Sequence, residues 1–187
     1  MERAIKERSI LDEFCEKFCK IVDKYTQYII VSGFVAIASG RVRGTEDIDM
    51  IIAKISKEKL VLLHEELLKA GFICVQSDDA SVIYDYLQEK ISVRYTYQNM
   101  PVPEMEMKFA KDFLDDYQLQ TRQKLPLTGL NVWFSSINMN VAFKEQYLKS
   151  DKDLEDAKHL RVVFKDQINE DEIRKITQLI NKYRLGN

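Results

Sequence analysis

Two aspartates and a serine–glycine turn are the residues of this chain best suited to metal and phosphate chemistry. Asp47 and Asp49 begin the apolar run DIDMIIAK (47–54), which is predicted to be a strand. Residues two apart on a strand point to the same side. Two such carboxylates repel each other unless a cation lies between them, and Mg²⁺ accepts one or two carboxylates together with phosphate and water oxygens. We therefore expect this pair to bind Mg²⁺ or Mn²⁺.

The segment before the aspartates has features suited to a phosphate group. YIIVSG (28–33) predicts a strand that enters a turn at Ser32 and Gly33, followed by a short helix over 34–40. Glycine lets a phosphate approach the backbone, and a helix N-terminus offers unpaired N–H groups. Arg41 and Arg43 then add positive charge just before the aspartates. A lone D-x-D or Ser-Gly is common, but their combination within apolar strands favours a phosphate and metal site over a solvated loop.

A second group of charged residues occurs late in the chain. Lys144 precedes Lys152, Asp153 and Asp156 in the stretch VAFKEQYLKSDKDLEDAKHL. Lys144, Leu148 and Lys152 form an i, i+4 row, and both aspartates can share the helix face of Lys152. From the residues alone, the preferred interpretation is a solvated helix face with local salt bridges.

The other segments predict an α/β (α+β) fold in which helices flank a mixed sheet. We expect residues 1–136 to form a core with an N-terminal helix, and residues 137–187 to form a helical region packed on it. Ser56 and Gly71 are suited to cap the ends of one helix. Helices are predicted over 4–25, 56–71, 104–118, 140–164 (one helix or a pair) and 169–186, and further strands over 72–76, 81–87, 91–98 and 127–136.

Composition limits the classes of protein to consider. The chain has 187 residues, enough for one compact domain with a sizeable core. Its net charge of −2 argues against a broad nucleic-acid-binding surface, although a local basic patch would still fit. Three cysteines imply no disulfide framework. The N-terminus is too charged for a signal peptide, and the chain lacks a long apolar run, so we expect a cytoplasmic location.

The stretch 31–52 resembles the signature of the nucleotidyltransferase superfamily, in which a Gly-Gly or Gly-Ser turn is followed by D-x-D or D-x-E. Here Ser32-Gly33 stands at the turn, a small departure that keeps the glycine. Within that superfamily, residues 28–165 are most similar to the small prokaryotic AbiEii-like group, which includes type IV toxin–antitoxin toxins. That group often has a lysine at the start of a late helix and then a Lys/Arg-Asp-x-x-Asp run, matched here by Lys144, Lys152, Asp153 and Asp156.

The resemblance implies the nucleotidyltransferase fold and a Mg²⁺-dependent reaction. A nucleoside monophosphate would pass from a nucleoside triphosphate to a hydroxyl of an acceptor (RNA, protein or a small molecule), and pyrophosphate would leave. A cognate antitoxin would be a further partner. The implied roles are metal binding for Asp47 and Asp49, phosphate binding for Ser32, Gly33, Arg41, Arg43, Lys144 and Lys152, and service as base, or as orienting group behind the site, for Asp153 or Asp156.

One departure from the superfamily keeps a second interpretation open. Many polymerase-like members supply a third carboxylate from a later strand, and the matching strand here is expected to be ISVRYTY (91–97). Ser92 and Arg94 occupy the expected face, and neither is a carboxylate; Asp85 is a weaker substitute. The chain would then be a non-catalytic nucleotide-binding or protein-interaction module. A third interpretation is an antitoxin-like partner of a toxin or an RNA.

Overall fold

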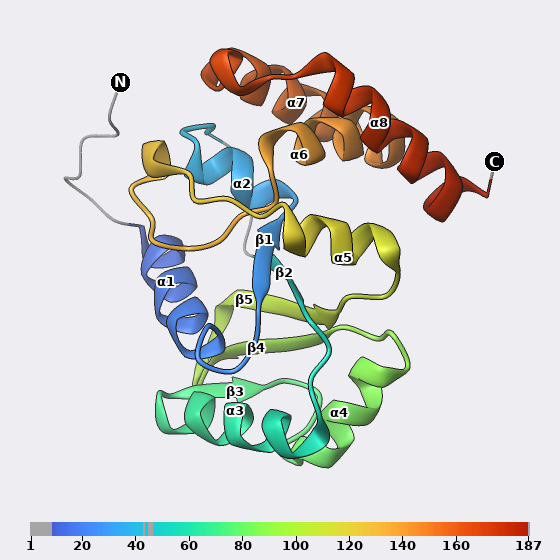
Figure 1. Ribbon diagram of the computed structural model, residues 1–187. Helices are drawn as coiled ribbons and strands as arrows, with labels where there is room; N and C mark the ends of the chain where they lie inside the picture. Colours follow the sequence, from blue (N-terminus) through green and yellow to red (C-terminus); the bar gives the residue numbers. More distant parts are fainter. Residues whose placement is uncertain (1–8, 43, 45–46, 187) are drawn as a thin grey trace.

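The computed structural model describes residues 9–42, 44 and 47–186. A five-stranded mixed sheet forms the centre of the molecule, in the order β1-β2-β5-β4-β3 (Figure 1). Only the central pair, β2 and β5, is parallel; the other neighbours are antiparallel. The strands are β1 (Tyr28–Val31), β2 (Asp47–Ile52), β3 (Phe72–Cys74), β4 (Val93–Tyr97) and β5 (Met100–Phe109).

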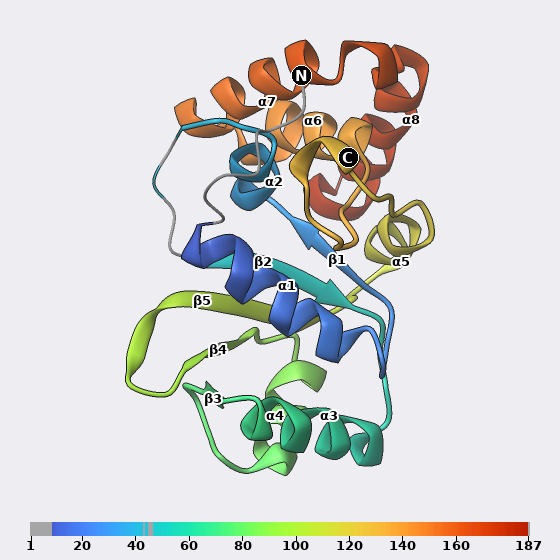
Figure 2. The ribbon, with the colours of Figure 1, turned by 90° about the vertical axis from the view of Figure 1, so that its left-hand side faces the viewer.

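Helices lie near both edge strands of the sheet, β1 and β3. In Figures 1 and 2, α3 and α4 lie near β3, whereas α2, α6, α7 and α8 gather beyond β1. The α-helices are α1 (Ile10–Val22), α2 (Gly33–Ala38), α3 (Lys57–Lys69), α4 (Ala80–Gln88), α5 (Phe113–Gln120), α6 (Ile137–Phe143), α7 (Asp151–Val163) and α8 (Glu170–Ile180). The short elements are the 3-10 helices η1 (Pro126–Thr128) and η3 (Lys165–Gln167) and the π-helices η2 (Lys144–Leu148) and η4 (Asn181–Leu185).

The two faces of the sheet differ in chemistry because apolar and polar residues alternate along β2 and β5. Ile48, Met50 and Ile52 of β2 are buried in the main core. Met105, Met107 and Phe109 of β5 join them there. The residues between them point to the other face. That face has a small apolar cluster of its own, formed by Ile29, Ile51, Ala110 and Leu119.

The predicted start of the fold is confirmed. Strands β1 and β2 are antiparallel neighbours, and Val31 is paired with Asp49. The short helix α2 connects them, followed by the loop that carries Arg41. Arg43 lies outside the described residues.

Three later predictions are wrong. Residues 104–109 form the end of β5 instead of a helix, because the period-two alternation of EMEMKF fits a half-buried strand. SVIYDYL (81–87) lies in α4, where the Asp79 carboxylate caps the helix and Ile83 and Leu87 bury one face. Residues 127–136 begin in η1 and form only isolated bridges, from Phe134 to Ile30 and Gln123.

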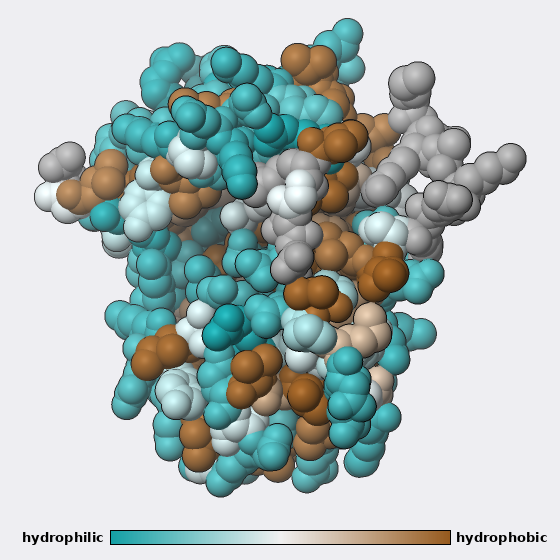
Figure 3. All heavy atoms as spheres, turned by 180° about the vertical axis from the view of Figure 1, so that it is seen from behind, coloured by the Kyte–Doolittle hydropathy of each residue, from teal (hydrophilic) through white to brown (hydrophobic). Residues whose placement is uncertain are grey.

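The C-terminal helices pack on each other and on the loop before β2. Asn138 of α6 donates to Glu172 of α8 at 2.6 Å, and α7 contacts α2. The division into residues 1–136 and 137–187 stays a prediction. None of the helices in the described part of the chain is long and apolar enough to cross a membrane. On the face opposite to that in Figure 1, apolar side chains form small groups among hydrophilic ones (Figure 3).

Candidate functional site

Four carboxylates lie in register on the central parallel strand pair. Asp49 of β2 is paired with Glu106 of β5, and Asp47 is paired with Glu104. Register partners on parallel strands share a face of the sheet, so these side chains point the same way. Burial raises the pKa of Asp49, and the charge of Glu106 raises it further. The site therefore holds its negative charges at an energetic cost that a cation would relieve.

Glu106 corrects the expected absence of a carboxylate beside the aspartates. The third carboxylate was expected on ISVRYTY, but that stretch contains β4, and β5 lies between β2 and β4. Arg94 of β4 is paired with Glu106 from the opposite side and lies 3.7 Å from Glu104. Asp85 lies in α4. The alternation of EMEMKF was the sequence signal that could have located Glu106.

Ser32 lies next to Asp49 in an unusual backbone conformation. Its φ is +67° and its ψ is −139°, a region that glycine adopts far more readily than serine. Ser32 precedes α2 but does not cap it with its side chain. The proximity of its hydroxyl to Asp49 instead lowers the pKa of that carboxyl, against the effect of burial. Strained residues of this kind persist where the surrounding structure holds them, often at functional sites.

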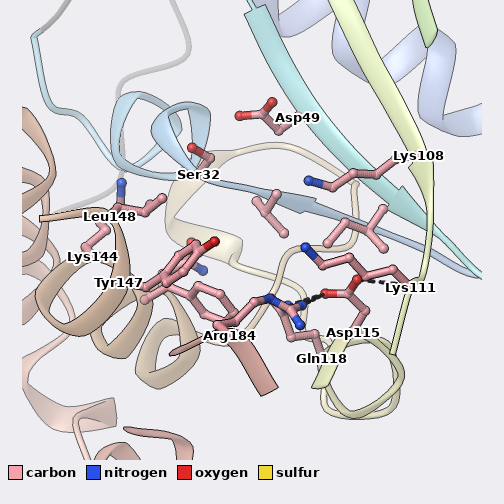
Figure 4. Close-up of a pocket in the computed structure, with 14 residues that line it drawn as sticks. Ser32, Asp49, Lys108, Lys111, Asp115, Gln118, Lys144, Tyr147, Leu148 and Arg184 are labelled. Atoms are coloured by element: carbon pink, nitrogen blue, oxygen red, sulfur yellow. Dashed lines mark hydrogen bonds and ion pairs between the residues drawn. The ribbon is translucent and has the colours of Figure 1, made fainter. Parts of the chain in front are cut away.

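A cavity of about 270 Å³ adjoins Ser32 and Asp49 (Figure 4). One wall comes from α6 and η2, the other from β5 and α5, and the C-terminal η4 closes the end away from Asp49. Four of its lining side chains are basic, which suits an anionic ligand. The lining residues are Val31, Ser32, Asp49, Ile51, Lys108, Lys111, Asp115, Gln118, Asn140, Phe143, Lys144, Tyr147, Leu148 and Arg184.

Lys144 is held in this wall by the aspartates of α7. Its Nζ lies 2.9 Å from Asp156 Oδ2 and 3.4 Å from Asp153 Oδ1. Lys144 is 1% exposed, and Asp156 is fully buried. Asp156 also pairs with Arg41, from the loop before β2. A buried carboxylate shared by two cations is suited to positioning them.

The other predicted phosphate ligands lie outside the cavity lining. Arg41 turns towards α7, where it pairs with Glu155 as well as Asp156 and donates to the Lys152 carbonyl at 3.0 Å. The Lys152 side chain is exposed. Asp153 and Asp156 likewise do not line the cavity and reach it through Lys144. Gly33 begins α2 directly behind Ser32.

The end of the cavity away from Asp49 contains an ion-pair network that the sequence did not indicate. Arg184 of η4 lies 2.7 Å from Asp115 and also pairs with Asp112. The Lys111 backbone N–H donates to Asp115 at 3.0 Å. Burial lowers the pKa of Lys111, and the charge of Arg184 lowers it further. A bound anion would relieve this repulsion, so the basic residues here favour an anionic ligand.

The carboxylates alone do not enclose a metal ion. In the described part of the chain, no three acidic, histidine or cysteine side chains are gathered closely enough to hold one. A divalent cation at Asp49 would need further oxygen ligands from a bound molecule or water. Mg²⁺ usually binds in this manner, through one or two carboxylates plus substrate phosphates.

The mixed sheet, its flanking helices and the turn beside the aspartate strand define a nucleotidyltransferase-like fold. The structure is similar to a nucleotidyltransferase-like antigenic protein from Paracoccidioides brasiliensis, with a TM-score of 0.52, 19% identity, and coverage of 95% of this chain and 91% of that one. It is also similar to the antibiotic-resistance factor ANT(2'')-Ia, with a TM-score of 0.53, 12% identity, and 94% of each chain covered. Neither a protein-family model nor a curated protein matches the sequence. At these identities the likeness concerns the fold.

Proposed function

We propose that the protein transfers a nucleoside monophosphate from a nucleoside triphosphate to a hydroxyl of an acceptor, with Mg²⁺ or Mn²⁺ as cofactor. The observation that carries this proposal is the pairing of Asp49 with Glu106 beside Ser32, at one end of a cavity lined by basic residues. Carboxylates suit a divalent cation, and the basic residues suit a triphosphate. The nucleotidyltransferase-like fold supports the same class of reaction.

In this proposal the sheet residues act on the reacting atoms. Asp47 and Asp49 would hold the metal together with phosphate and water oxygens, and the metal would neutralise charge on the transferred phosphoryl group. Ser32 and Gly33 lie against the phosphates. The acceptor oxygen bonds to the α-phosphorus as the bond to pyrophosphate breaks, and Glu106 accepts the proton of the acceptor hydroxyl. Glu106 takes the role of base that was expected of Asp153 or Asp156.

The cavity walls hold the triphosphate. Lys108, Lys111 and Lys144 provide the positive charge. Asp156, with Asp153, orients Lys144 instead of taking a proton, since its carboxylate is buried between Lys144 and Arg41. Of the two roles expected for these aspartates, base or orienting group, the proposal keeps the orienting one.

The reaction can be tested directly. The protein would be incubated with Mg²⁺ and each α-labelled nucleoside triphosphate, together with total transfer RNA, protein or aminoglycoside-type acceptors. We expect label on one acceptor class, and none with Asp49→Asn. Label transfer that persists in Asp49→Asn would contradict the assignment of the metal site. A wild-type protein that binds nucleotide but labels no acceptor would favour the non-catalytic module, whereas the position of Glu106 beside Asp49 supports the catalytic proposal.

Membership of the AbiEii-like group, an antitoxin partner and a cytoplasmic location stay predictions. The match at Lys144, Lys152, Asp153 and Asp156 supports the group. A neighbouring antitoxin gene, whose product forms a complex with this chain and suppresses its activity, would be the expected finding. Growth unaffected by expression of the protein alone would argue against a toxin.

A further inference from the structure

Two amide side chains line the cavity with opposite polarity. Gln118 comes from α5 and Asn140 from α6, so they lie on the two facing walls of the cavity, and neither is among the proposed triphosphate contacts. Both side chains are nearly buried, at 3% and 4% exposure. Ser135, which is 1% exposed, connects them: its hydroxyl binds Gln118, and its carbonyl binds Asn140.

The orientation of Asn140 is fixed by two acceptors. Its Nδ2 donates to the carbonyl of Ser135 at 2.9 Å and to that of Ser136 at 3.0 Å. Both amide protons are therefore used, and a flipped amide would place its oxygen against two carbonyl oxygens. Asn140 consequently offers its oxygen, a hydrogen-bond acceptor, to a ligand in the cavity.

The orientation of Gln118 is fixed in the reverse sense. Its Oε1 accepts from the Ser135 hydroxyl at 2.9 Å, and its Nε2 donates to Asp115 Oδ1 at 3.3 Å. Asp115 already accepts from Arg184 and from the Lys111 N–H, so a flipped Gln118 would bring oxygen against a carboxylate. The second proton of Nε2 is left for a ligand, and Gln118 acts as a donor.

We propose that Gln118 and Asn140 read the nucleobase, so that the pocket selects nucleotides by the hydrogen-bond polarity of the base edge. This inference rests on the proposed function. Adenine and cytosine present an amino donor beside a ring-nitrogen acceptor, whereas hypoxanthine and uracil present a carbonyl acceptor beside a ring N–H donor. Because the Gln118 donor and the Asn140 acceptor cannot exchange places, they can pair with only one of these two base edges, and they place like groups against the other. Phe143 and Tyr147, one helical turn apart on the wall formed by α6 and η2, offer aromatic surface to the base.

Pairs of nucleotides that match in size but differ in polarity test this proposal. The affinities of ATP and ITP, and of CTP and UTP, would be measured with Mg²⁺ by titration calorimetry. A bidentate contact discriminates by about 1–3 kcal/mol, so we expect roughly 5- to 150-fold between the members of at least one pair. The same polarity should be favoured in both pairs. Equal affinities within each pair would overturn the inference, whereas no binding of any nucleotide would overturn the proposed function as well.

Variants connect the selectivity to the two amides. In Gln118→Met and Asn140→Leu, the preference should fall to within about threefold, while the affinity for inorganic tripolyphosphate stays unchanged. Gln88→Met, which removes an amide on α4, is the matched control and should retain the preference. If a buried variant fails to fold, Ser135→Ala keeps both amides but releases Gln118 from the serine hydroxyl, and it should still weaken the preference. A preference that persists in all the folded variants would overturn the assignment.

Discussion

Glu106 lies opposite Asp49 on the only parallel strand pair of the sheet, and its charge, together with burial, raises the pKa of Asp49. The two carboxylates come from distant parts of the sequence, yet one backbone register brings them together. The two carboxylates repel each other, and substitution of either one removes that repulsion.

Glu106→Gln should lower turnover by at least about 100-fold, because the amide cannot accept the proton of the acceptor hydroxyl. Nucleotide affinity should change little, since the basic residues of the cavity remain. Glu104→Gln is the matched control: it lies two residues away on the same strand, beside Arg94, and should have a much smaller effect. Single-turnover label transfer and nucleotide titration give the two quantities. Equal losses in both variants would argue against Glu106 as the base.

Asp49→Asn should abolish turnover and raise the melting temperature of the metal-free protein. Because the pKa of Asp49 is raised in the folded state, folded protein holds this proton to higher pH than unfolded protein does. The carboxyl therefore lowers stability increasingly as pH rises through its raised pKa. At pH 8 the melting temperature should rise by about 2–4 °C for each kcal/mol of unfolding free energy that the variant gains, and at pH 4 the rise should be smaller. Asp166→Asn, at an exposed position, should show no such gain.

Asp156→Ala should destabilise the protein by about 3–5 kcal/mol, because it leaves Lys144 and Arg41 without their shared buried carboxylate. Glu155→Ala removes an exposed partner of the same arginine and should cost less than about 1 kcal/mol. Urea denaturation measures both changes. The conservative variant Asp156→Asn separates the two roles: as an orienting residue it should weaken nucleotide binding, whereas a base would lose turnover with binding intact.

Magnesium should bind weakly alone and more tightly when a nucleotide is present, because the phosphates supply oxygen ligands beyond those of Asp47 and Asp49. Titration calorimetry with and without a non-hydrolysable nucleotide measures this coupling. Asp49→Ala should remove it. Nucleotide affinity that is the same with and without metal, in wild type and variant alike, would contradict a metal site at these residues.

The first part of the fold could be predicted because its signals are local. The apolar run before Ser32, the short helix and the alternation in DIDMII each describe one element, and adjacent elements commonly pair. The position of β5 was missed for a physical reason. Glu, Met and Lys favour helices in isolation, and this propensity outweighed an alternation that tertiary burial then stabilised in Met105 and Met107.

The site was only partly predictable, because its remaining contacts join distant segments. Asp156 binds Lys144 within the helical region, at a spacing that sequence can suggest, but its pairing with Arg41 spans 115 residues. Arg184 and Asp115 are 69 residues apart, and no local pattern marks either of them. Whether a charged helical residue faces solvent or a buried counter-ion is decided by the packing of elements, which periodicity alone does not contain.

The parallel pairing of β2 with β5 also has a consequence for how the chain is assembled. Everything from α3 to β4 must be synthesised between these two strands, and parallel neighbours cannot be joined by a tight hairpin. During translation, β1 can pair with β2 early, but the other edge of β2 has no partner until residue 109 has left the ribosome. Before β5 emerges, the nascent chain exposes an open edge of β2 next to Asp49. Chaperone binding or mispairing would be concentrated at that edge.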